Sequence, residues 1–199
     1  LKDFYLIRTD APCYQENDIM LGVTYLNQLA DRLGLPLVIC IALGTNFGGR
    51  TANSPLASIL DIYGNIANRA IVIAAGNEAN QRHHFLGTAD NVNDTRQVEI
   101  RVGENVSGFC MELWSDALDL FAVSIISPSG EQTYRFPIRS EQTANYTFVL
   151  ERTTVTVDYK VFVERLNSEL IFFRFINPTP GIWKIEVEDF PAFILVDDK

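Results

Sequence analysis

The sequence lacks long apolar runs and an excess of basic residues. No stretch of 18 apolar residues occurs, so we expect no transmembrane helix. Lys and Arg number 16 against 25 Asp and Glu, which gives a net charge of -9, and no basic cluster interrupts this acidic chain. Because such a chain repels phosphate backbones, we expect no nucleic-acid partner. The lack of a long apolar run leads us to expect no membrane span.

Cysteine and histidine are also scarce, with three and two residues respectively. Cys13, Cys40 and Cys110 are widely spaced and fit neither a disulfide framework nor a zinc site. Cys40 lies within the apolar run PLVICIAL and is predicted to pack as a small hydrophobic side chain. Oxygen ligands in TADNVND suit calcium, but a polar linker is the favoured interpretation, so we expect no metal and no cofactor.

The first half of the chain alternates strand-like and helix-like segments. Residues 16–34 carry apolar side chains at helical spacing and end at Gly34. A helix is predicted from Ser54, an N-cap residue followed by Pro55. The two runs LVICIAL and AIVIAA flank this helix and are apolar throughout, as strands buried on both faces are. The pattern predicts a β-α-β unit with a parallel sheet.

The second half changes to period-two alternation. Segments such as QVEIRV, GFCMELW, TYRFPI, YTFVL, ELIFFRFIN and GIWKIEVE are separated by the turn signals SPSGE, RLNSE and NPTPG. Many short strands of this kind predict a β-sandwich or jelly roll. Trp114 and Trp183 lie in these strands and are expected to pack in the core rather than form a sugar-binding platform.

The predicted fold class is therefore α/β, a parallel-sheet segment followed by an all-β jelly-roll or sandwich domain. The polar stretch HHFLGTADNVNDT separates the two, and we place the domains at 1–90 and 91–199. The start at Leu1 and the end after FILVDDK lead us to expect an internal piece of a longer protein.

The most informative stretch is AIVIAAGNE, where a strand ends in small residues, a glycine, an amide and an acid. Ligands of parallel sheets bind at the carboxyl ends of strands. There Gly76 would allow close backbone approach, and Asn77 would present a neutral N–H donor, which suits an oxyanion that forms transiently. A plain Gly-Asn turn is the alternative. The run LVICIALG ends in the same way, and we expect both ends to lie at one rim.

These residues carry a resemblance to a known family. PLVICIALGTNFGG, a helix and then AIVIAAGNE resemble the paired strand motifs of subtilisin-like serine proteases, the subtilases, over about residues 1–85. The resemblance implies that Asn77 is the oxyanion-hole donor. It further implies a set of substrate-binding residues, which are Ala42, Leu43, Gly44, Ala74, Ala75, Gly76 and Glu78. The first three would offer backbone groups to an extended substrate. The rest would wall the S1 pocket, with Glu78 near its floor.

The chain departs from that family in two ways. Ala42 stands where the family usually has Ser, a mild change at a site that acts through its backbone. More important, no Asp-[Ser/Thr]-Gly, His-Gly-Thr or Gly-Thr-Ser-x-Ala motif occurs. The only histidines, His83 and His84, follow the asparagine, whereas the family's catalytic histidine precedes it, and we interpret them as loop residues. We therefore expect this chain alone to lack an assembled triad and to be inactive.

Segments in both halves of the chain resemble one subtilase group, the clostridial proteases that include those of spore germination. In that group a jelly-roll domain is inserted between the oxyanion asparagine and the catalytic serine, and YQENDIMLGVTYL, GNEANQRHH, ISPSGE and GIWKIEVE look similar to it. The resemblance implies a secreted or spore-associated bacterial protein. A glycine-rich dinucleotide loop at GTNFGG is disfavoured because the G-x-G-x-x-G spacing is missing.

The function predicted for the parent protein is hydrolysis of peptide bonds by a serine endopeptidase. The alternative is a pseudoprotease whose β-domain serves as a protein-binding or folding-support module, and a carbohydrate-binding jelly roll ranks below both. The partners expected are a protein or peptide substrate and the remainder of the catalytic domain. Copies of the fragment are also expected to self-associate through exposed apolar strand edges.

Overall fold

The computed structural model describes residues 15–49, 52–77, 80–88, 95–116, 119–138, 143–163 and 168–190, without the side chains of 162, 189 and 190. The chain divides into two compact units, Leu1–His84 and Phe85–Lys199, which we describe separately. The sequence placed the domain boundary six residues later, after residue 90. Of the predicted site residues, Glu78 lies outside the described residues.

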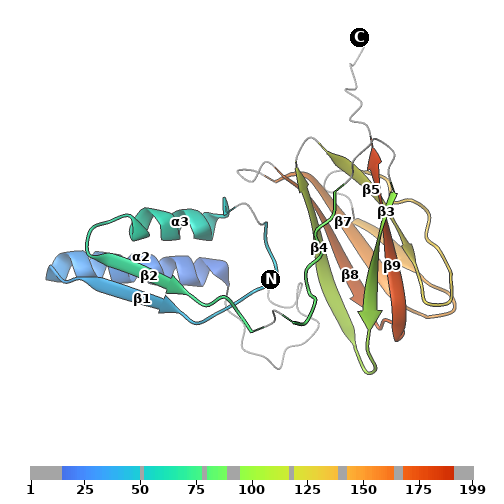
Figure 1. Cartoon of the computed structure of the whole chain (residues 1–199), viewed down its shortest axis with the longest axis horizontal. Coiled ribbons are helices and arrows are strands. Elements are labelled where there is room, and N and C mark those ends of the chain that lie inside the picture. Colours follow the sequence, from blue (N-terminus) through green and yellow to red (C-terminus); the bar gives the residue numbers. More distant parts are fainter. Residues whose placement is uncertain are drawn as a thin grey trace, which may run out of the picture. The chain divides into compact units, whose positions relative to one another are not determined.

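The described part of the first unit consists of two helices and two strands (Figure 1). They follow in the order α2 (Glu16–Leu33), β1 (Leu37–Ile41), α3 (Pro55–Gly64) and β2 (Arg69–Ile73). Ser54 accepts a hydrogen bond from the Ala57 N–H at 3.1 Å, so the predicted N-cap is confirmed. Gly34 ends α2 with a φ of 63°, in the left-handed region that glycine adopts at little cost. Neither described helix is long and apolar enough to cross a membrane.

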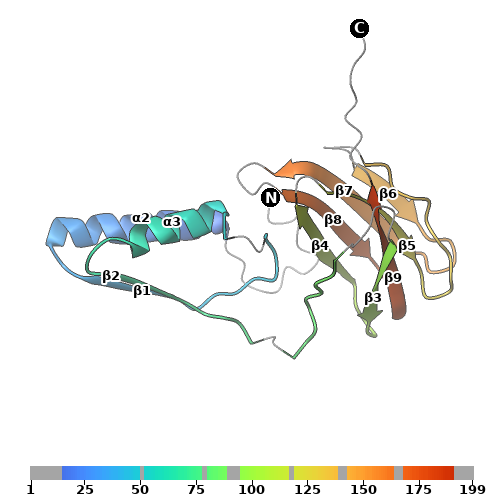
Figure 2. The same ribbon diagram turned by 45° about the horizontal axis from the view of Figure 1, so that its top comes forward.

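β1 and β2 pair in parallel, from Leu37 opposite Arg69 to Ile41 opposite Ile73. Both helices lie on one side of this pair (Figures 1 and 2). Ile39 is buried there, whereas Val38 on the other face is 71% exposed. Cys40 is exposed as well, so the prediction that it packs as a hydrophobic side chain is wrong. The sequence suggested that these strands are buried on both faces, but in the described structure only one face is covered.

The second unit is a sandwich of two antiparallel sheets. One sheet has the order β3-β9-β5 and the other has the order β4-β8-β7-β6. The strands are β3 (Thr95–Val102), β4 (Gly108–Asp116), β5 (Leu120–Ile126), β6 (Thr143–Thr147), β7 (Thr154–Val163), β8 (Ser168–Ile176) and β9 (Gly181–Phe190). Alternate side chains of each strand point between the sheets, which is why the period-two segments form this core.

Aromatic side chains fill the space between the sheets. Trp183 is fully buried, packs edge-on against Phe148 and Phe175 with ring centroids 5.0 and 5.5 Å away, and donates its indole N–H to the Thr179 carbonyl. The prediction of a core role is confirmed for Trp183. Trp114 is only partly buried, and its indole N–H donates to Glu112.

The predicted fold class is wrong. The described chain is mostly β-strand, with two helices, and every described strand after β2 pairs in an antiparallel manner. The parallel arrangement is limited to the two-stranded pair β1–β2, and the structure shows no parallel-sheet subtilisin segment. The physical reason is the balance of patterns along the chain. Two short continuous apolar runs make one small parallel pair, whereas the alternating segments occupy most of the remaining length.

Candidate functional site

The ends of β1 and β2 bring most of the predicted site residues together. Beyond the last register pair, the Ala74 N–H donates to the Ile41 carbonyl at 3.0 Å and extends the pairing by one residue. Further along, a Cβ atom added to Gly44 would lie 3.9 Å from the Gly76 Cα. The segments 42–44 and 74–76 therefore stay neighbours after both strands have ended.

Gly76 determines how the chain leaves β2. Its φ is +84°, a conformation that residues with a side chain rarely adopt. The turn at Gly76 places Asn77 directly after the strand end, and Asn77 is exposed. A residue with a Cβ at position 76 would strain this turn. The glycine thus fixes the direction of the backbone that carries the amide.

The other predicted site residues lie open to solvent. Ala42, Gly44, Ala74 and Ala75 are exposed, and Leu43 keeps 43% of its surface accessible. In the described residues these positions form an open strand-end surface rather than an enclosed pocket wall. Glu78, the last residue of the AIVIAAGNE motif, lies outside the described residues. The individual roles that the resemblance implies stay predictions.

The two histidines lie after this strand end. His83 and His84 are both exposed within the described stretch 80–88. Across the described part of the chain, no group of three or more His, Cys, Asp or Glu side chains could hold a metal ion. The chemistry that the described strand ends offer is thus hydrogen bonding by backbone groups and by the neutral Asn77 amide.

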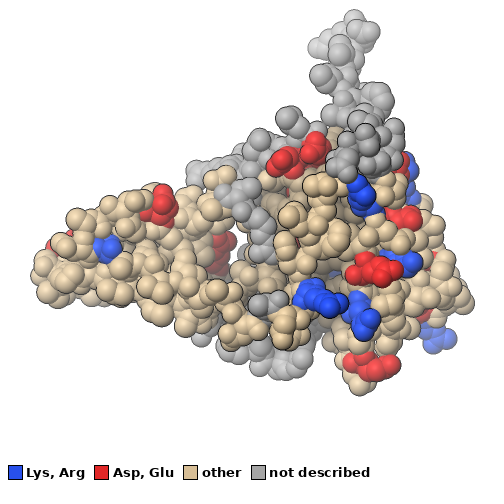
Figure 3. Space-filling view, in the orientation of Figure 1, with Lys and Arg blue, Asp and Glu red and all other residues tan. Residues whose placement is uncertain are grey.

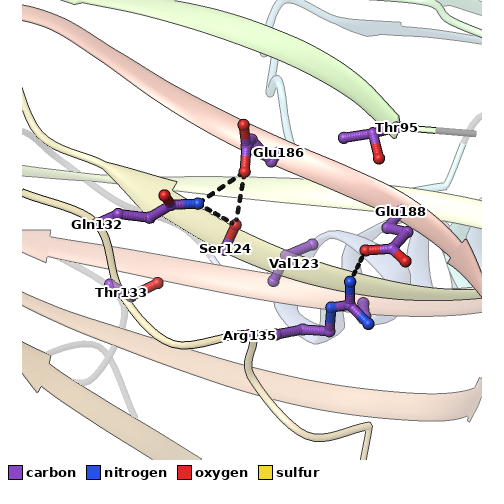
Figure 4. A pocket seen from close by; sticks show the side chains of 9 residues that line it. Thr95, Val123, Ser124, Gln132, Thr133, Arg135, Glu186 and Glu188 are labelled. Atoms are coloured by element: carbon purple, nitrogen blue, oxygen red, sulfur yellow. Dashed lines mark hydrogen bonds and ion pairs between the residues drawn. The ribbon is translucent and has the colours of Figure 1, made fainter. Parts of the chain in front are cut away.

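A second, polar hollow lies on the sandwich. It encloses about 180 Å³, and Figure 4 shows its polar side chains. Gln132 and Ser124 both donate to Glu186, at 2.8 and 3.1 Å, and Arg135 forms an ion pair with Glu188. Each of these two carboxylates already has a partner within the protein, so we interpret the hollow as part of the sheet surface and not as a binding site.

Sequence reasoning missed one buried carboxyl group. Glu169 on β8 is fully buried, although acids are seldom buried without a partner. The period-two pattern of SELIFFRFI does contain the signal, since it puts Glu169 on the same face as Ile171, Phe173 and Phe175. A charged residue in a core-facing register position is the feature that could have identified it.

Comparisons with known proteins give a structural result alone. No protein-family model matches the sequence, and no curated protein matches it. Among solved structures, the chain resembles the Clostridium perfringens CspB protease, with a TM-score of 0.75 and 22% sequence identity. The match covers 94% of this chain and 40% of that one, so the chain spans well under half of the protease. At this identity the likeness shows that the chain has the fold of a part of that protease.

Proposed function

We propose that the chain is part of a subtilisin-like serine endopeptidase, to which it contributes the oxyanion-hole donor Asn77. The observation behind this proposal is that the segments after β1 and β2 stay side by side. Gly44 and Gly76 approach each other there, and Asn77 follows the turn at Gly76. The fold likeness to a protease supports it, because that likeness extends over 94% of the chain.

The chemistry of Asn77 suits this role. The tetrahedral intermediate of peptide hydrolysis carries a negative oxygen that the substrate carbonyl lacks. A side-chain amide donates an N–H to that oxygen and stays neutral, so its help does not depend on a protonation state. Gly76 adopts a positive φ that residues with a side chain rarely take, so this turn depends on glycine to carry the chain from β2 to Asn77.

The neighbouring strand ends suit an extended peptide. Ala42, Leu43 and Gly44 would offer backbone groups to the substrate, as a strand added beside β1 does. Ala74, Ala75 and Gly76 would wall the S1 pocket, and the outer acid Glu78 would lie near its floor. The nucleophile, the general base and its orienting acid would come from other parts of the protein.

A second candidate is a pseudoprotease in which the β-sandwich is the working part. The well-packed core of the second unit favours it, since such a domain has the stability of a self-contained binding or folding-support module. The two candidates differ in the catalytic residues that the longer protein carries. A fluorophosphonate probe, which labels an activated serine, would react with the endopeptidase and leave a pseudoprotease unlabelled.

The direct test is Asn77→Ala in the longer protein. Loss of one oxyanion donor costs about 3–4 kcal/mol of transition-state stabilisation. We therefore expect kcat to fall by hundreds-fold while KM changes little, measured with a peptide substrate. Asn80→Ala is the matched control, because Asn80 is an exposed residue of the same type three positions further on. An unchanged kcat in Asn77→Ala would exclude the proposed role.

For the isolated 199-residue chain we propose no peptidase activity, because the motifs of the triad are missing from its sequence. Its proposed partners are a peptide substrate and the remainder of the catalytic domain. Val38 and Val72, 71% and 56% exposed on the open face of β1–β2, also favour self-association of the isolated chain. Cleavage of a peptide ester by the purified chain would contradict the first proposal, and a clean monomer in gel filtration would contradict self-association.

A further inference from the structure

Glu169 occupies a core position in the β-sandwich. Along β8 its side chain shares a face with Ile171, Phe173 and Phe175, and all four residues have no exposed surface. It is thus the end member of a row that is otherwise apolar. A carboxyl group here has left water, which costs far more for the ionised form than for the neutral acid.

The hydrogen bonds of Glu169 satisfy one of its two oxygens. Oε2 accepts from the Phe121 backbone N–H at 3.1 Å and from the Ser115 hydroxyl at 3.2 Å. The Ser115 hydroxyl also lies 3.3 Å from the Asp119 carbonyl, and its single proton can serve only one acceptor at a time. The other oxygen, Oε1, is buried and has no hydrogen-bond partner.

The surroundings of Glu169 favour the neutral acid. Among the described residues no ion pair joins it to a cation. Asp119, before β5, adds a negative charge, and Asp116 ends the neighbouring strand β4. On β7, Tyr159 faces it with a neutral phenol, whose pKa burial raises. Burial and, to a smaller extent, Asp119 raise the pKa of Glu169 to about 7, against the opposing effect of Phe121 and Ser115.

Glu169 also joins the two sheets. It belongs to β8 of the four-stranded sheet, where Ser115 of β4 is its register partner, whereas Phe121 belongs to β5 of the three-stranded sheet. The carboxyl therefore bridges the sheets at the end of the sandwich where β4 ends and β5 and β8 begin. Whatever changes the charge of this group acts on the contact between the sheets.

We propose that Glu169 is a proton-controlled latch between the two sheets, closed when the carboxyl is neutral and loosened when it is ionised. The neutral acid keeps the bond from Phe121 at little cost in desolvation. When the proton leaves to solvent, a carboxylate with one unpartnered oxygen stays in the core, and separation of β5 from β8 lets water reach it. The device thus makes one end of the sandwich open more readily as pH rises.

The sign of the pH effect follows from the shift. The pKa of Glu169 is raised in the closed state relative to the ordinary value of 4.5 in an open, hydrated one. The closed state therefore binds more protons between about pH 4.5 and 7. The extra stability of the closed state over the open state is therefore fully present below pH 4.5 and is lost as the pH rises to about 7.

Hydrogen exchange of the intact chain tests the latch. Between pH 5 and pH 8, after correction for intrinsic exchange, protection of the Phe121 amide should fall by roughly 100-fold, about tenfold for each pH unit in the window. Amides of residues 171–175 should change little, because β8 lies between β4 and β7 within its own sheet. Equal protection at both pH values, or an equal loss in both segments, would overturn the proposal.

Two variants assign the effect to this carboxyl. In Glu169→Gln the side chain is neutral at every pH, and its amide oxygen can still accept from Phe121. Protection of the Phe121 amide in this variant should therefore stay high and independent of pH. Glu99→Gln makes the same change at an exposed residue that lies 3.6 Å from Lys184, and it should keep the pH dependence of the unmodified chain. A pH dependence retained in Glu169→Gln would contradict the latch.

A second measurement needs no variant. Carbon-13 NMR of the side-chain carboxyl follows the ionisation of Glu169 in the unmodified protein, so it decides the matter even if Glu169→Gln does not fold. A titration midpoint near 7 supports the latch, and a midpoint at or below 4.5 excludes it.

Discussion

The two units of the chain bury their apolar side chains to very different extents. In the sandwich, side chains as large as Trp183, Phe136 and Phe173 have no exposed surface. In the described part of the first unit, the buried hydrophobic residues are Val23, Ala30 and Ile39. Several large side chains there are exposed, and they include Leu21, Tyr25, Leu33, Val38, Ile62 and Val72.

Surface charge differs between the units in the same sense. In the view of Figure 3, Lys, Arg, Asp and Glu side chains are spread over the sandwich, whereas the described surface of the first unit shows few of them. A surface with many apolar and few charged side chains is characteristic of an interface. The comparison teaches that the sandwich completes its own core, whereas the described part of the first unit leaves large apolar side chains exposed.

Removal of an aromatic side chain from the sandwich core should cause the largest loss of stability. Trp183→Ala deletes a fully buried indole and its contacts with Phe148 and Phe175, which we expect to cost about 3–5 kcal/mol of unfolding free energy. Denaturant unfolding followed by circular dichroism measures the loss. Val149→Ala is the control, because that side chain is 77% exposed, and its cost should stay below about 0.5 kcal/mol. A similar cost in both variants would show that the sandwich core is not tightly packed.

A glycine at the start of β9 should give a smaller effect in the same unit. A Cβ at Gly181 would lie 2.8 Å from the Pro128 Cβ, and the φ of Gly181 is +141°. Gly181→Ala therefore combines a clash with backbone strain, and we expect the free energy of unfolding to fall by about 2 kcal/mol. Thermal unfolding measures this loss. Gly103→Ala meets no atom within 4 Å and serves as the control. If Gly181→Ala unfolds at the temperature of the unmodified chain, the close approach to Pro128 is wrong.

Loss of the α3 cap should have the smallest effect, and it should be confined to the first unit. Ser54→Ala removes the acceptor of the Ala57 N–H, which typically costs about 1 kcal/mol. Faster hydrogen exchange should appear in α3 while the sandwich amides keep their rates. Ser58→Ala, one turn further into the helix, should leave α3 exchange the same or slower, because alanine is the better helix former. Slower exchange in Ser54→Ala would refute the capping role.

Local signals in the sequence predicted the ends of helices well. Ser54 followed by Pro55, and Gly34 after an amphipathic stretch, are determined by short-range hydrogen bonding and by backbone conformation. Strand limits were less certain. TYRFPI was predicted to be a strand, but Pro137 lacks an N–H, and residues 133–138 are not one. Instead, the backbone amides of Thr133 and Phe136 donate to the Ile125 and Val123 carbonyls of β5.

Long-range packing is what the sequence did not reveal. YTFVL alternates well enough for a strand, but β6 ends at Thr147 and the Arg152 N–H donates to the Phe148 carbonyl, so Val149 and Leu150 lie exposed in a turn. Cys40 looked buried because its neighbours are apolar, yet exposure depends on what covers the other face of β1. The strand ends around Asn77 followed from motif order, whereas the burial of Glu169 depends on contacts among β4, β5 and β8.

Equilibrium unfolding of the two units made as separate chains tests the contrast between them most directly. Residues 85–199 alone should unfold in one cooperative transition, with a midpoint close to that of the sandwich within the whole chain. Residues 1–84 alone should show no cooperative transition. A cooperative transition for residues 1–84, or its absence for residues 85–199, would contradict the view that only the sandwich is complete in itself.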